Sequence, residues 1–270
     1  MSEHFPKTVL TIAGFDPSSG AGITADLKTI SAHGLYGTAC ITSLTVQSTR
    51  GVRRMEAVPP DLVLETIAAL VEDIPPAAVK IGMLGSGRIA KVVAGFLKKT
   101  CLPNIVLDPV LRSSSGKALL DRSGIRVLQE LLGLVDVVTP NIEEAGVLAG
   151  RTVGNEEDME EACRTLQRMG AKNAVITGGH LRHPVDVLLG EQTQGIVQRY
   201  RHEKVETRST HGTGCAYSTA IACNLAKGIS LAGEEGNAIF LAGQYVHAAL
   251  KEAYPIGKGT GPINHLHHRR

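Results

Sequence analysis

The chain has 270 residues, of which 43% are hydrophobic and 20% charged, and its 28 basic and 26 acidic residues give a formal net charge of +2. A chain of this length can bury an ample core, and an α/β protein of this size is commonly one domain. Both signs of charge are scattered along the sequence, which argues against a nucleic acid or a membrane surface as partner. We therefore expect a single domain over residues 1–270 that binds neither.

The cysteines indicate a reducing compartment. They are odd in number, widely spaced and form no C-x-x-C pair, so neither a disulfide framework nor a zinc site is expected. Residues 1–7 do not form a basic and then apolar leader, and no apolar run approaches the ~18 residues of a membrane span. We expect a soluble, unprocessed protein located in the cytoplasm.

Short apolar runs rich in β-forming residues alternate with longer helical patterns. The predicted buried strands are Thr8–Ala13, Ala78–Met83, Ile105–Leu107, Val135–Val138 and Ala174–Thr177. The predicted helices are Gly22–His33, Asp61–Asp73, Gly87–Lys99, Ser123–Leu132, Glu156–Met169, Gly214–Lys227 and Leu231–Ala253. Val185–Leu189 and Gly195–Arg201 flank a turn and are expected to form an antiparallel hairpin at one edge. This alternation predicts an α/β fold with a mostly parallel sheet covered on both faces, which binds ligands beyond the carboxyl ends of its strands.

The first strand leads into a loop rich in Gly and Ser, residues 14–22, which opens a helix. No Gly-Lys-Ser/Thr sequence closes this loop, so it is not a P-loop. Its partial G-x-G-x-x-A pattern lacks the acidic residue expected about 20 positions later in a dinucleotide site, so a nicotinamide enzyme is not expected. Asp26 on the following helix is either a site residue or an exposed carboxylate. Gln47 is either a surface residue or an amide that reads the edge of a heterocycle, because an amide donates and accepts hydrogen bonds at once.

Asn141 and Glu144 follow a predicted strand and stand three residues apart at the start of a helix, on one helical face. Two interpretations stay open at this point. Oxygen ligands of this kind suit Mg²⁺, which usually keeps several waters and reaches the protein through one or two carboxylates. The same spacing also fits an N-terminal cap in which Asn141 and Glu144 satisfy each other's backbone N–H groups.

The segment Arg208–Ala216 brings two glycines up to a cysteine at the start of a small-residue helical run. Gly212 and Gly214 let the backbone approach a phosphate closely, and the first N–H groups of a helix point at a bound anion. Cys215 at this helix N-terminus is expected to have a pKa below that of a free thiol, and so to form a thiolate readily. The alternative is a glycine-rich turn that precedes a buried cysteine.

Two further loops, Asp108–Gly116 and Thr177–His180, follow predicted strands and are expected at the ligand edge of the sheet. The C-terminal segment Asn264–Arg270 is basic and polar, and we expect a solvated end rather than a metal site.

In this order the motifs resemble the ribokinase-like superfamily, and within it the hydroxymethylpyrimidine/phosphomethylpyrimidine kinases of thiamine synthesis. The resemblance spans nearly the whole chain. It rests on Thr11–Gly14, Asp16–Ser18, Gly20–Gly22, Ala25–Thr29, Gln47, Lys80–Leu84, Asp108–Val110, Thr139–Asn141 with Glu144, Gly178–His180, Thr210–Cys215, and Gly257–Gly259 before Gly261 and Pro262.

The resemblance implies a three-layer α/β/α fold and a homodimer that uses ATP and Mg²⁺. The implied reaction phosphorylates 4-amino-5-hydroxymethyl-2-methylpyrimidine to its monophosphate and then to the diphosphate. The implied pyrimidine contacts are Gly14, Asp26, Gln47, Met83 and Val110, and the implied magnesium residues are Asn141 and Glu144. The implied anion hole around the transferring phosphate consists of Gly212, Thr213 and Gly214, with Cys215 beside the reacting oxygen. The implied nucleotide contacts are Asn141, Thr177, Gly179 and Lys258.

Two positions depart from this family pattern, because many relatives have lysine where Thr177 and Ser114 stand. The site therefore has fewer mobile cations, for which Lys80, Arg112 or Lys258 are candidate replacements. The nearest alternative is a pyridoxal or pyridoxine kinase, in which aspartate usually stands in place of Cys215, so the thiol favours a pyrimidine acceptor. A second alternative is a non-catalytic pyrimidine-binding relative, against which the retained glycines and Cys215 argue.

Overall fold

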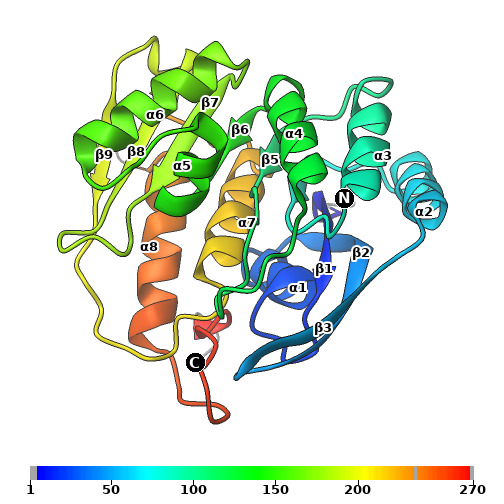
Figure 1. Cartoon of the computed structure of the whole chain (residues 1–270), viewed down its shortest axis with the longest axis horizontal. Coiled ribbons are helices and arrows are strands. Elements are labelled where there is room, and N and C mark those ends of the chain that lie inside the picture. Colours follow the sequence, from blue (N-terminus) through cyan, green and yellow to red (C-terminus); the bar gives the residue numbers. More distant parts are fainter. Residues whose placement is uncertain (1–4, 234–235, 268–270) are drawn as a thin grey trace.

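The computed structural model describes residues 5–233 and 236–267, which form one nine-stranded sheet between two layers of helices (Figure 1). The strand order is β3-β2-β1-β4-β5-β6-β7-β8-β9. The strands are β1 Thr8–Phe15, β2 Tyr36–Ser48, β3 Gly51–Ala57, β4 Ala78–Ile81, β5 Ile105–Leu107, β6 Val137–Val138, β7 Asn173–Thr177, β8 Val185–Gly190 and β9 Gln198–Arg201. The helices are α1 Gly22–Ala32, α2 Pro60–Asp73, α3 Gly87–Leu97, α4 Arg122–Leu131, α5 Ile142–Ala149, α6 Glu156–Arg168, α7 Thr213–Ala226 and α8 Ala238–Lys251.

The middle of the sheet is parallel and its two edges are antiparallel. Strands β2, β1, β4, β5, β6 and β7 run in one direction, whereas β3, β8 and β9 pair antiparallel with their neighbours. The central strands β4, β5 and β6 are buried throughout, as expected for a parallel sheet with helices on both faces. The carboxyl ends of the parallel strands therefore meet at one edge of the sheet.

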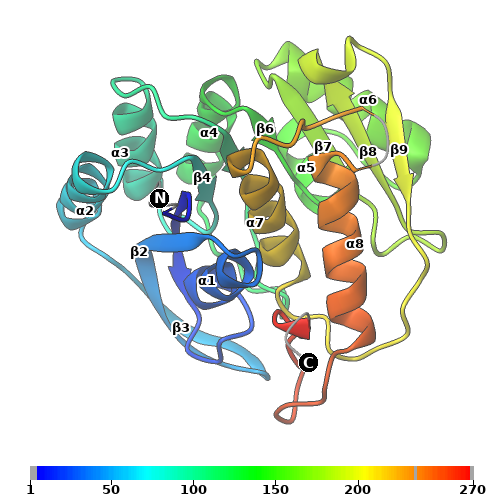
Figure 2. The ribbon, with the colours of Figure 1, turned by 180° about the vertical axis from the view of Figure 1, so that it is seen from behind.

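Helices α1, α7 and α8 cover one face of the sheet and α2 to α6 cover the other (Figures 1 and 2). The two faces have separate apolar cores, one built around α3, α4 and α6 and the other around α7 and α8. Helix α7 is rich in small residues, and ten of its residues are buried. Small side chains let this helix pack closely against β1, β4 and β5, which places its N-terminus at the carboxyl edge of the sheet. Among the described residues no helix is long and apolar enough to cross a membrane.

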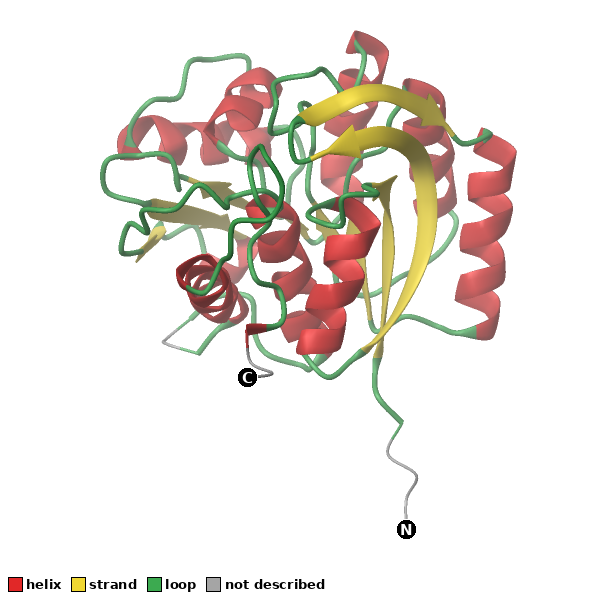
Figure 3. Ribbon diagram, turned by 90° about the horizontal axis from the view of Figure 1, so that it is seen from below, coloured by secondary structure: helices red, strands yellow, loops and turns green. Residues whose placement is uncertain are grey.

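The expected alternation of strands and helices is confirmed, with element ends that differ by a few residues, and the hairpin of β8 and β9 is antiparallel as predicted. The expected start of the last helix at Leu231 is wrong, because α8 begins at Ala238, where the side chain of Asn237 caps Phe240 N. The sequence analysis also missed the long curved ribbon of β2 and β3 at one edge of the sheet (Figure 3). Leu44 and Val46 of β2 are about half exposed, so this part of the strand lacks the buried apolar run that marks the central strands.

The C-terminal segment is packed into the molecule. Ile263 belongs to the core beside α7 and α8, and the side chains of His265 and His267 are buried. The Tyr245 hydroxyl on α8 donates a hydrogen bond to the His265 carbonyl at 2.7 Å. The expected solvated end is therefore wrong for residues 264–267, since Ile263 anchors the polar residues that follow it. Residues 268–270 lie outside the described residues.

Candidate active site

A cavity of about 750 Å³ lies at the carboxyl ends of the parallel strands. Five strands each place a residue in its wall, at the strand end or just beyond it. These residues are Gly14 of β1, Met83 after β4, Val110 after β5, Asn141 after β6 and Thr177 of β7. This is the position at which open parallel sheets bind ligands. Most of the residues expected at the site from sequence are thus brought to one cavity by the topology of the sheet.

One end of the cavity has a mixed apolar and amide surface suited to a flat heterocycle. Met83 and Val110 provide the apolar part, and the half-buried Gln47 of β2 provides the amide. A Cβ atom on Gly14 would meet the end of the Met83 side chain, so glycine here lets Met83 pack directly against the backbone at the cavity. Such a surface fits a small aromatic ring that carries polar substituents.

Asp26, expected from the sequence to contact the ligand, lies behind the cavity wall. Its side chain is completely buried, which also excludes the exposed helix carboxylate considered above. Its oxygens accept hydrogen bonds from the Thr11 hydroxyl at 2.6 Å and the Thr219 hydroxyl at 2.8 Å. The Lys80 ammonium donates to both oxygens, at 3.0 and 3.1 Å. The carboxylate is therefore occupied inside the protein, and it is Lys80 that belongs to the cavity wall.

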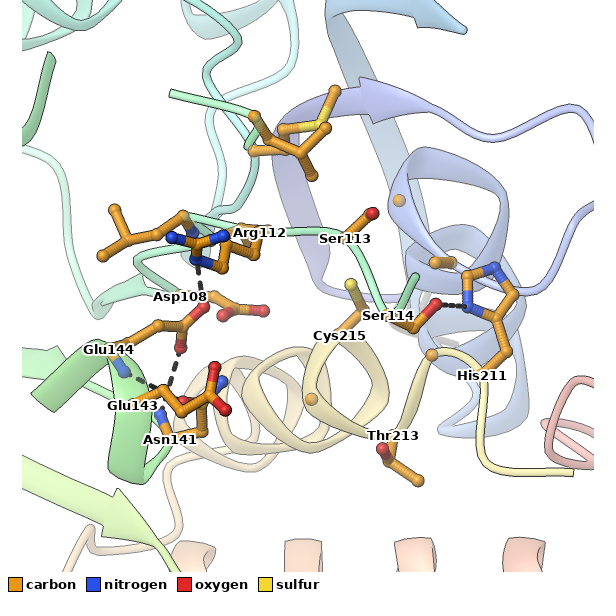
Figure 4. A pocket seen from close by; sticks show the side chains of 18 of the residues that line it. Asp108, Arg112, Ser113, Ser114, Asn141, Glu143, Glu144, His211, Thr213 and Cys215 are labelled. Atoms are coloured by element: carbon orange, nitrogen blue, oxygen red, sulfur yellow. Dashed lines mark hydrogen bonds between the residues drawn. The ribbon is translucent and has the colours of Figure 1, made fainter. Parts of the chain in front are cut away.

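The N-terminus of α7 also lies in the cavity wall, close to Gln47, whose Nε2 is 3.3 Å from Nε2 of His211, the residue before the helix cap. Gly212 is the N-cap of this helix with φ of 88°, and a Cβ atom there would collide with the Gly20 carbonyl oxygen, so the turn requires glycine. In the described chain the backbone N–H groups of Gly214 and Cys215 donate to no other backbone group. Thr213, Gly214 and Cys215 all line the cavity, and Figure 4 shows Cys215 facing the site from this first turn. The turn therefore provides donors for an anion such as a transferring phosphate.

The expected low pKa of Cys215 is contradicted by its surroundings. Burial is the largest influence and raises the pKa of this thiol to about 12. Lys80 lowers the pKa, but Asp108 and Asp26 oppose it by raising the energy of a thiolate. The helix N-terminus considered in the sequence analysis is thus outweighed by desolvation and by two nearby carboxylates. In the unliganded protein Cys215 is a neutral thiol at physiological pH.

Asn141 and Glu144 form the reciprocal cap at the start of α5. The Asn141 side chain accepts from Glu144 N at 3.0 Å, and the Glu144 carboxyl group accepts from Asn141 N at 3.1 Å. Burial, and then the nearby Asp108 carboxylate, raise the pKa of Glu144 to about 8, as the two side chains face each other across the site (Figure 4). Capping does not exclude the magnesium interpretation, because both residues also line the cavity.

Asp16, Ser114 and His211 form a connection across the cavity that sequence analysis missed. His211 Nε2 lies 2.8 Å from Asp16 Oδ2, and His211 Nδ1 lies 3.1 Å from Ser114 Oγ. Burial alone would raise the pKa of Asp16, but hydrogen bonds from His211 and Ser18 outweigh it, so the pKa is lowered. Ser114, which stands where many relatives have lysine, thus bonds to a histidine. Asp16 and His211 are 195 residues apart in the chain, and no local pattern pairs them.

The expected nucleotide contacts are only partly brought together. Thr177 lines the cavity and its backbone N–H donates to the Pro140 carbonyl oxygen at 3.0 Å. Gly179 is exposed beside the cavity rather than in its wall, next to His180, which does line it. Lys258 is exposed on a loop that packs against Thr49, and only Thr260 of that loop reaches the cavity. The structure therefore does not place Lys258 where it replaces a missing cation.

Comparison with known proteins identifies close similarity along almost the entire chain. Residues 16–264 match the family model described as phosphomethylpyrimidine kinase. The hydroxymethylpyrimidine/phosphomethylpyrimidine kinase of Haemophilus influenzae is 40% identical over 271 residues, 98% of each chain. The thiamine biosynthesis bifunctional protein ThiED of Geobacter sulfurreducens is 42% identical over 266 residues, and the match spans 97% of this chain but only 53% of that protein.

Solved structures show the same fold. The pyridoxal kinase of Bacillus subtilis, determined as an ADP complex, superimposes with a TM-score of 0.87 at 33% identity, over 98% of this chain and 99% of the other. The phosphomethylpyrimidine kinase of Clostridium difficile superimposes with a TM-score of 0.77 at 38% identity, over 91% and 100%. The ribokinase-like α/β fold expected from the sequence is confirmed.

Proposed function

Since this chain belongs to the phosphomethylpyrimidine kinase family, we propose that it phosphorylates 4-amino-5-hydroxymethyl-2-methylpyrimidine with ATP and then phosphorylates the resulting monophosphate, as steps of thiamine biosynthesis. One observation carries the proposal: the wall of one cavity holds an amide and apolar surface together with the free N–H groups of α7 beside Cys215. The first surface suits an aminopyrimidine, and the second suits the phosphate that is transferred to it.

The pyrimidine ring packs against Met83 and Val110, and its polar edge pairs with the amide of Gln47. Gly14 lets the ring approach the backbone. Asp26 contributes indirectly, because its carboxylate already accepts hydrogen bonds from Thr11, Thr219 and Lys80. Cys215 lines the same cavity, and the proposal places the hydroxymethyl group beside it.

In the first transfer the acceptor hydroxyl loses its proton to the Cys215 thiolate while its oxygen bonds to the γ-phosphorus and the bond to the ADP oxygen breaks. The N–H groups of Gly214 and Cys215 stabilise the charge on the transferring phosphoryl group, as phosphoryl transfer requires mainly positioning and charge stabilisation. The thiol must first lose its own proton to solvent, and a cation bound with the nucleotide would lower its pKa. The second transfer has an ionised phosphate as acceptor and needs no base.

Asn141 and Glu144 are the residues that would hold Mg²⁺. Their amide and carboxyl oxygens line the cavity and are ligands that Mg²⁺ prefers. The ion supplies positive charge for the nucleotide phosphates. Because the pKa of Glu144 is about 8 in the unliganded protein, binding of the cation displaces a proton, and the affinity for Mg²⁺ increases from pH 6 to pH 9. We further propose that the protein works in the cytoplasm, as its cysteine usage indicates, and that it is a homodimer, as the family resemblance implies.

A pyridoxal kinase is the second candidate, favoured by the structural match with the Bacillus subtilis pyridoxal kinase. Pyridoxal also carries a hydroxymethyl group on a substituted nitrogen ring, so the same cavity offers it a place. Cys215, where most pyridoxal kinases have aspartate, favours the pyrimidine.

The test compares kcat/KM for three acceptors with saturating Mg-ATP, measured by ADP release: the hydroxymethylpyrimidine, its monophosphate and pyridoxal. The proposal predicts turnover of both pyrimidines with kcat/KM at least about tenfold above that of pyridoxal, the size of difference that a few pocket contacts produce. Turnover of pyridoxal alone would transfer the assignment to the second candidate. Tight pyrimidine binding without any turnover would identify a non-catalytic relative.

A further inference from the structure

Lys80 is the one charged residue in the buried strand β4, whose sequence is AVKI. Its side chain has no exposed surface, yet it belongs to the wall of the cavity, at the carboxyl end of the strand. A buried ammonium group is costly unless it is paired, and a residue placed in a central strand at such a cost requires an explanation. The mechanism proposed above uses Lys80 only as the partner of Asp26.

Asp26 fixes the position of this ammonium group. Lys80 Nζ donates to Asp26 Oδ1 at 3.1 Å and Oδ2 at 3.0 Å. The same carboxylate is held from β1 by Thr11 and from α7 by Thr219. Both oxygens of Asp26 therefore accept two hydrogen bonds each, and the carboxylate is held by residues of β1 and α7. This fixed carboxylate keeps the positive charge of Lys80 at the cavity wall.

The ammonium group retains one donor that the protein does not use. It carries three N–H bonds, and Asp26 is its only hydrogen-bonded acceptor among the described residues. The nearest other carboxylate oxygen, Asp108 Oδ2, is 3.9 Å away, beyond hydrogen-bond distance. A Cβ atom on Gly82 would lie 2.7 Å from Nζ, so the glycine keeps space beside the charge. Both Asp108 and Cys215 line the cavity next to it.

The two transfers share one electrostatic requirement. In the first, negative charge develops on the hydroxymethyl oxygen as it loses its proton, and in the second the attacking oxygen belongs to a phosphate that is already charged. A base therefore serves only the first step, whereas a fixed positive charge beside the acceptor oxygen serves both.

We propose that Lys80, held in place by Asp26, is the positive charge that stabilises the acceptor oxygen in both phosphoryl transfers. The inference rests on the proposed function and assigns Lys80 to the acceptor oxygen, whereas the sequence analysis considered it only as a replacement for a missing phosphate-binding cation. Lys80 keeps its three protons throughout. In the first transfer the hydroxyl proton goes to the Cys215 thiolate, in the second no proton is removed, and in both the γ-phosphorus exchanges its bond to ADP for a bond to the acceptor oxygen.

The test uses a double variant, Lys80→Met with Asp26→Asn, because removal of Lys80 alone leaves an unpaired buried carboxylate that destabilises the fold. The control is Lys172→Met with Asp136→Asn, which makes the same two changes in an exposed Lys–Asp pair, with atoms 2.8 Å apart, just before β6 and β7 at the amino ends of the strands. Unfolding midpoints identify variants that remain folded. Should the double variant be unstable, Thr219→Val removes one hydrogen bond that positions Asp26 and leaves both charges in place.

We expect the double variant to lose about 100-fold in kcat on both acceptors, the size of effect seen when a group that stabilises transition-state charge is removed. Cys215→Ala should lose mainly the first transfer. In calorimetric titrations without ATP, the double variant should bind the monophosphate about tenfold more weakly and bind the neutral alcohol with unchanged affinity. The control should match wild type, and Thr219→Val should lose several-fold in kcat on both acceptors.

A folded double variant with wild-type kcat on both acceptors would overturn the role of Lys80, as would equal weakening of alcohol and monophosphate binding, which indicates a structural role. If the double variant is unstable and Thr219→Val is used instead, unchanged kcat on both acceptors would overturn the role of Lys80. The absence of turnover in the wild-type protein would instead contradict the proposed function itself.

Discussion

The chemistry at Cys215 depends on its neighbours more than on its place at the start of α7. A thiol at a helix N-terminus is expected to ionise readily, but burial and the carboxylates of Asp108 and Asp26 raise its pKa to about 12. The residue type and position were predictable from the sequence. Its protonation state was not, because it is set by side chains distant in the chain.

The pH dependence of alkylation tests this protonation state. With a pKa of about 12, the thiolate fraction of Cys215 rises about tenfold for each pH unit between 7 and 10. We expect the rate of reaction with iodoacetamide, measured as the difference between wild type and Cys215→Ala, to rise through this range without a plateau. A plateau below pH 8 would show instead that the helix N-terminus dominates.

Glu144→Gln should stabilise the unliganded protein at alkaline pH. The pKa of Glu144 is raised from about 4.5 to about 8, so between these values the native state holds a proton that the unfolded state has lost, and stability falls as pH rises. Glutamine mimics the protonated form and removes this loss. We expect the free energy of unfolding to exceed that of wild type by about 4 kcal/mol at pH 8.5. At pH 4 the difference should almost vanish.

The exposed neighbour Glu143 provides the control, because Glu143→Gln changes the same charge without burial. Urea denaturation at the two pH values measures the difference. Equal stability of Glu144→Gln and wild type at pH 8.5 would mean that the pKa of Glu144 is not raised in the native state.

At the scale of elements, helix N-termini provide the polar groups of the site. The α7 N-terminus has no side-chain cap, which leaves its N–H groups free for an anion, whereas α5 is capped by Asn141 and Glu144. The spacing of Asn141 and Glu144 suggested both a cap and a cation site. The structure shows the cap, and the position of both residues in the cavity wall supports the proposed cation site.

A comparison of two helix N-caps distinguishes an effect on stability from an effect on activity. Asn141 caps α5 and Asn155 caps α6, each accepting a backbone hydrogen bond, at 3.0 and 2.8 Å. Replacing either with alanine should cost about 1 kcal/mol of stability. Only Asn141→Ala should also raise the Mg²⁺ concentration needed for half-maximal activity, which a magnesium titration of ADP release measures. An equal effect of Asn155→Ala on that titration would remove Asn141 from the proposed cation site.

At the scale of the whole molecule, the C-terminal segment contributes Ile263 to the core beside α7 and α8. Ile263 is 1% exposed, whereas Ile256, seven positions earlier in the same segment, is 53% exposed. Ile263→Ala should therefore lower the free energy of unfolding by about 2–4 kcal/mol, and Ile256→Ala by less than about 0.5 kcal/mol. Urea denaturation of both variants measures the contrast. Similar small losses for the two would mean that the segment is solvated, as its composition suggested.

Local patterns predicted the parallel centre of the sheet and the loops that line the cavity, because buried apolar runs and glycine-rich turns are encoded in neighbouring residues. Long-range partners were not predictable in the same way. Lys80 and Asp26 are 54 positions apart in the sequence. The sequence spacing of these residues therefore predicts neither the positive charge at the cavity wall nor the burial of Asp26. The exposed half of β2 was not predicted as a strand because its residues do not form an apolar run.

The most direct test of the central claim follows the products of the purified protein by mass spectrometry after Mg-ATP and hydroxymethylpyrimidine are added. The account predicts that the monophosphate appears first and is then converted to the diphosphate, with added hydroxymethylpyrimidine competitively inhibiting turnover of the monophosphate because one cavity serves both transfers. Absence of both phosphorylated products, with pyridoxal phosphate formed in a parallel reaction, would contradict it.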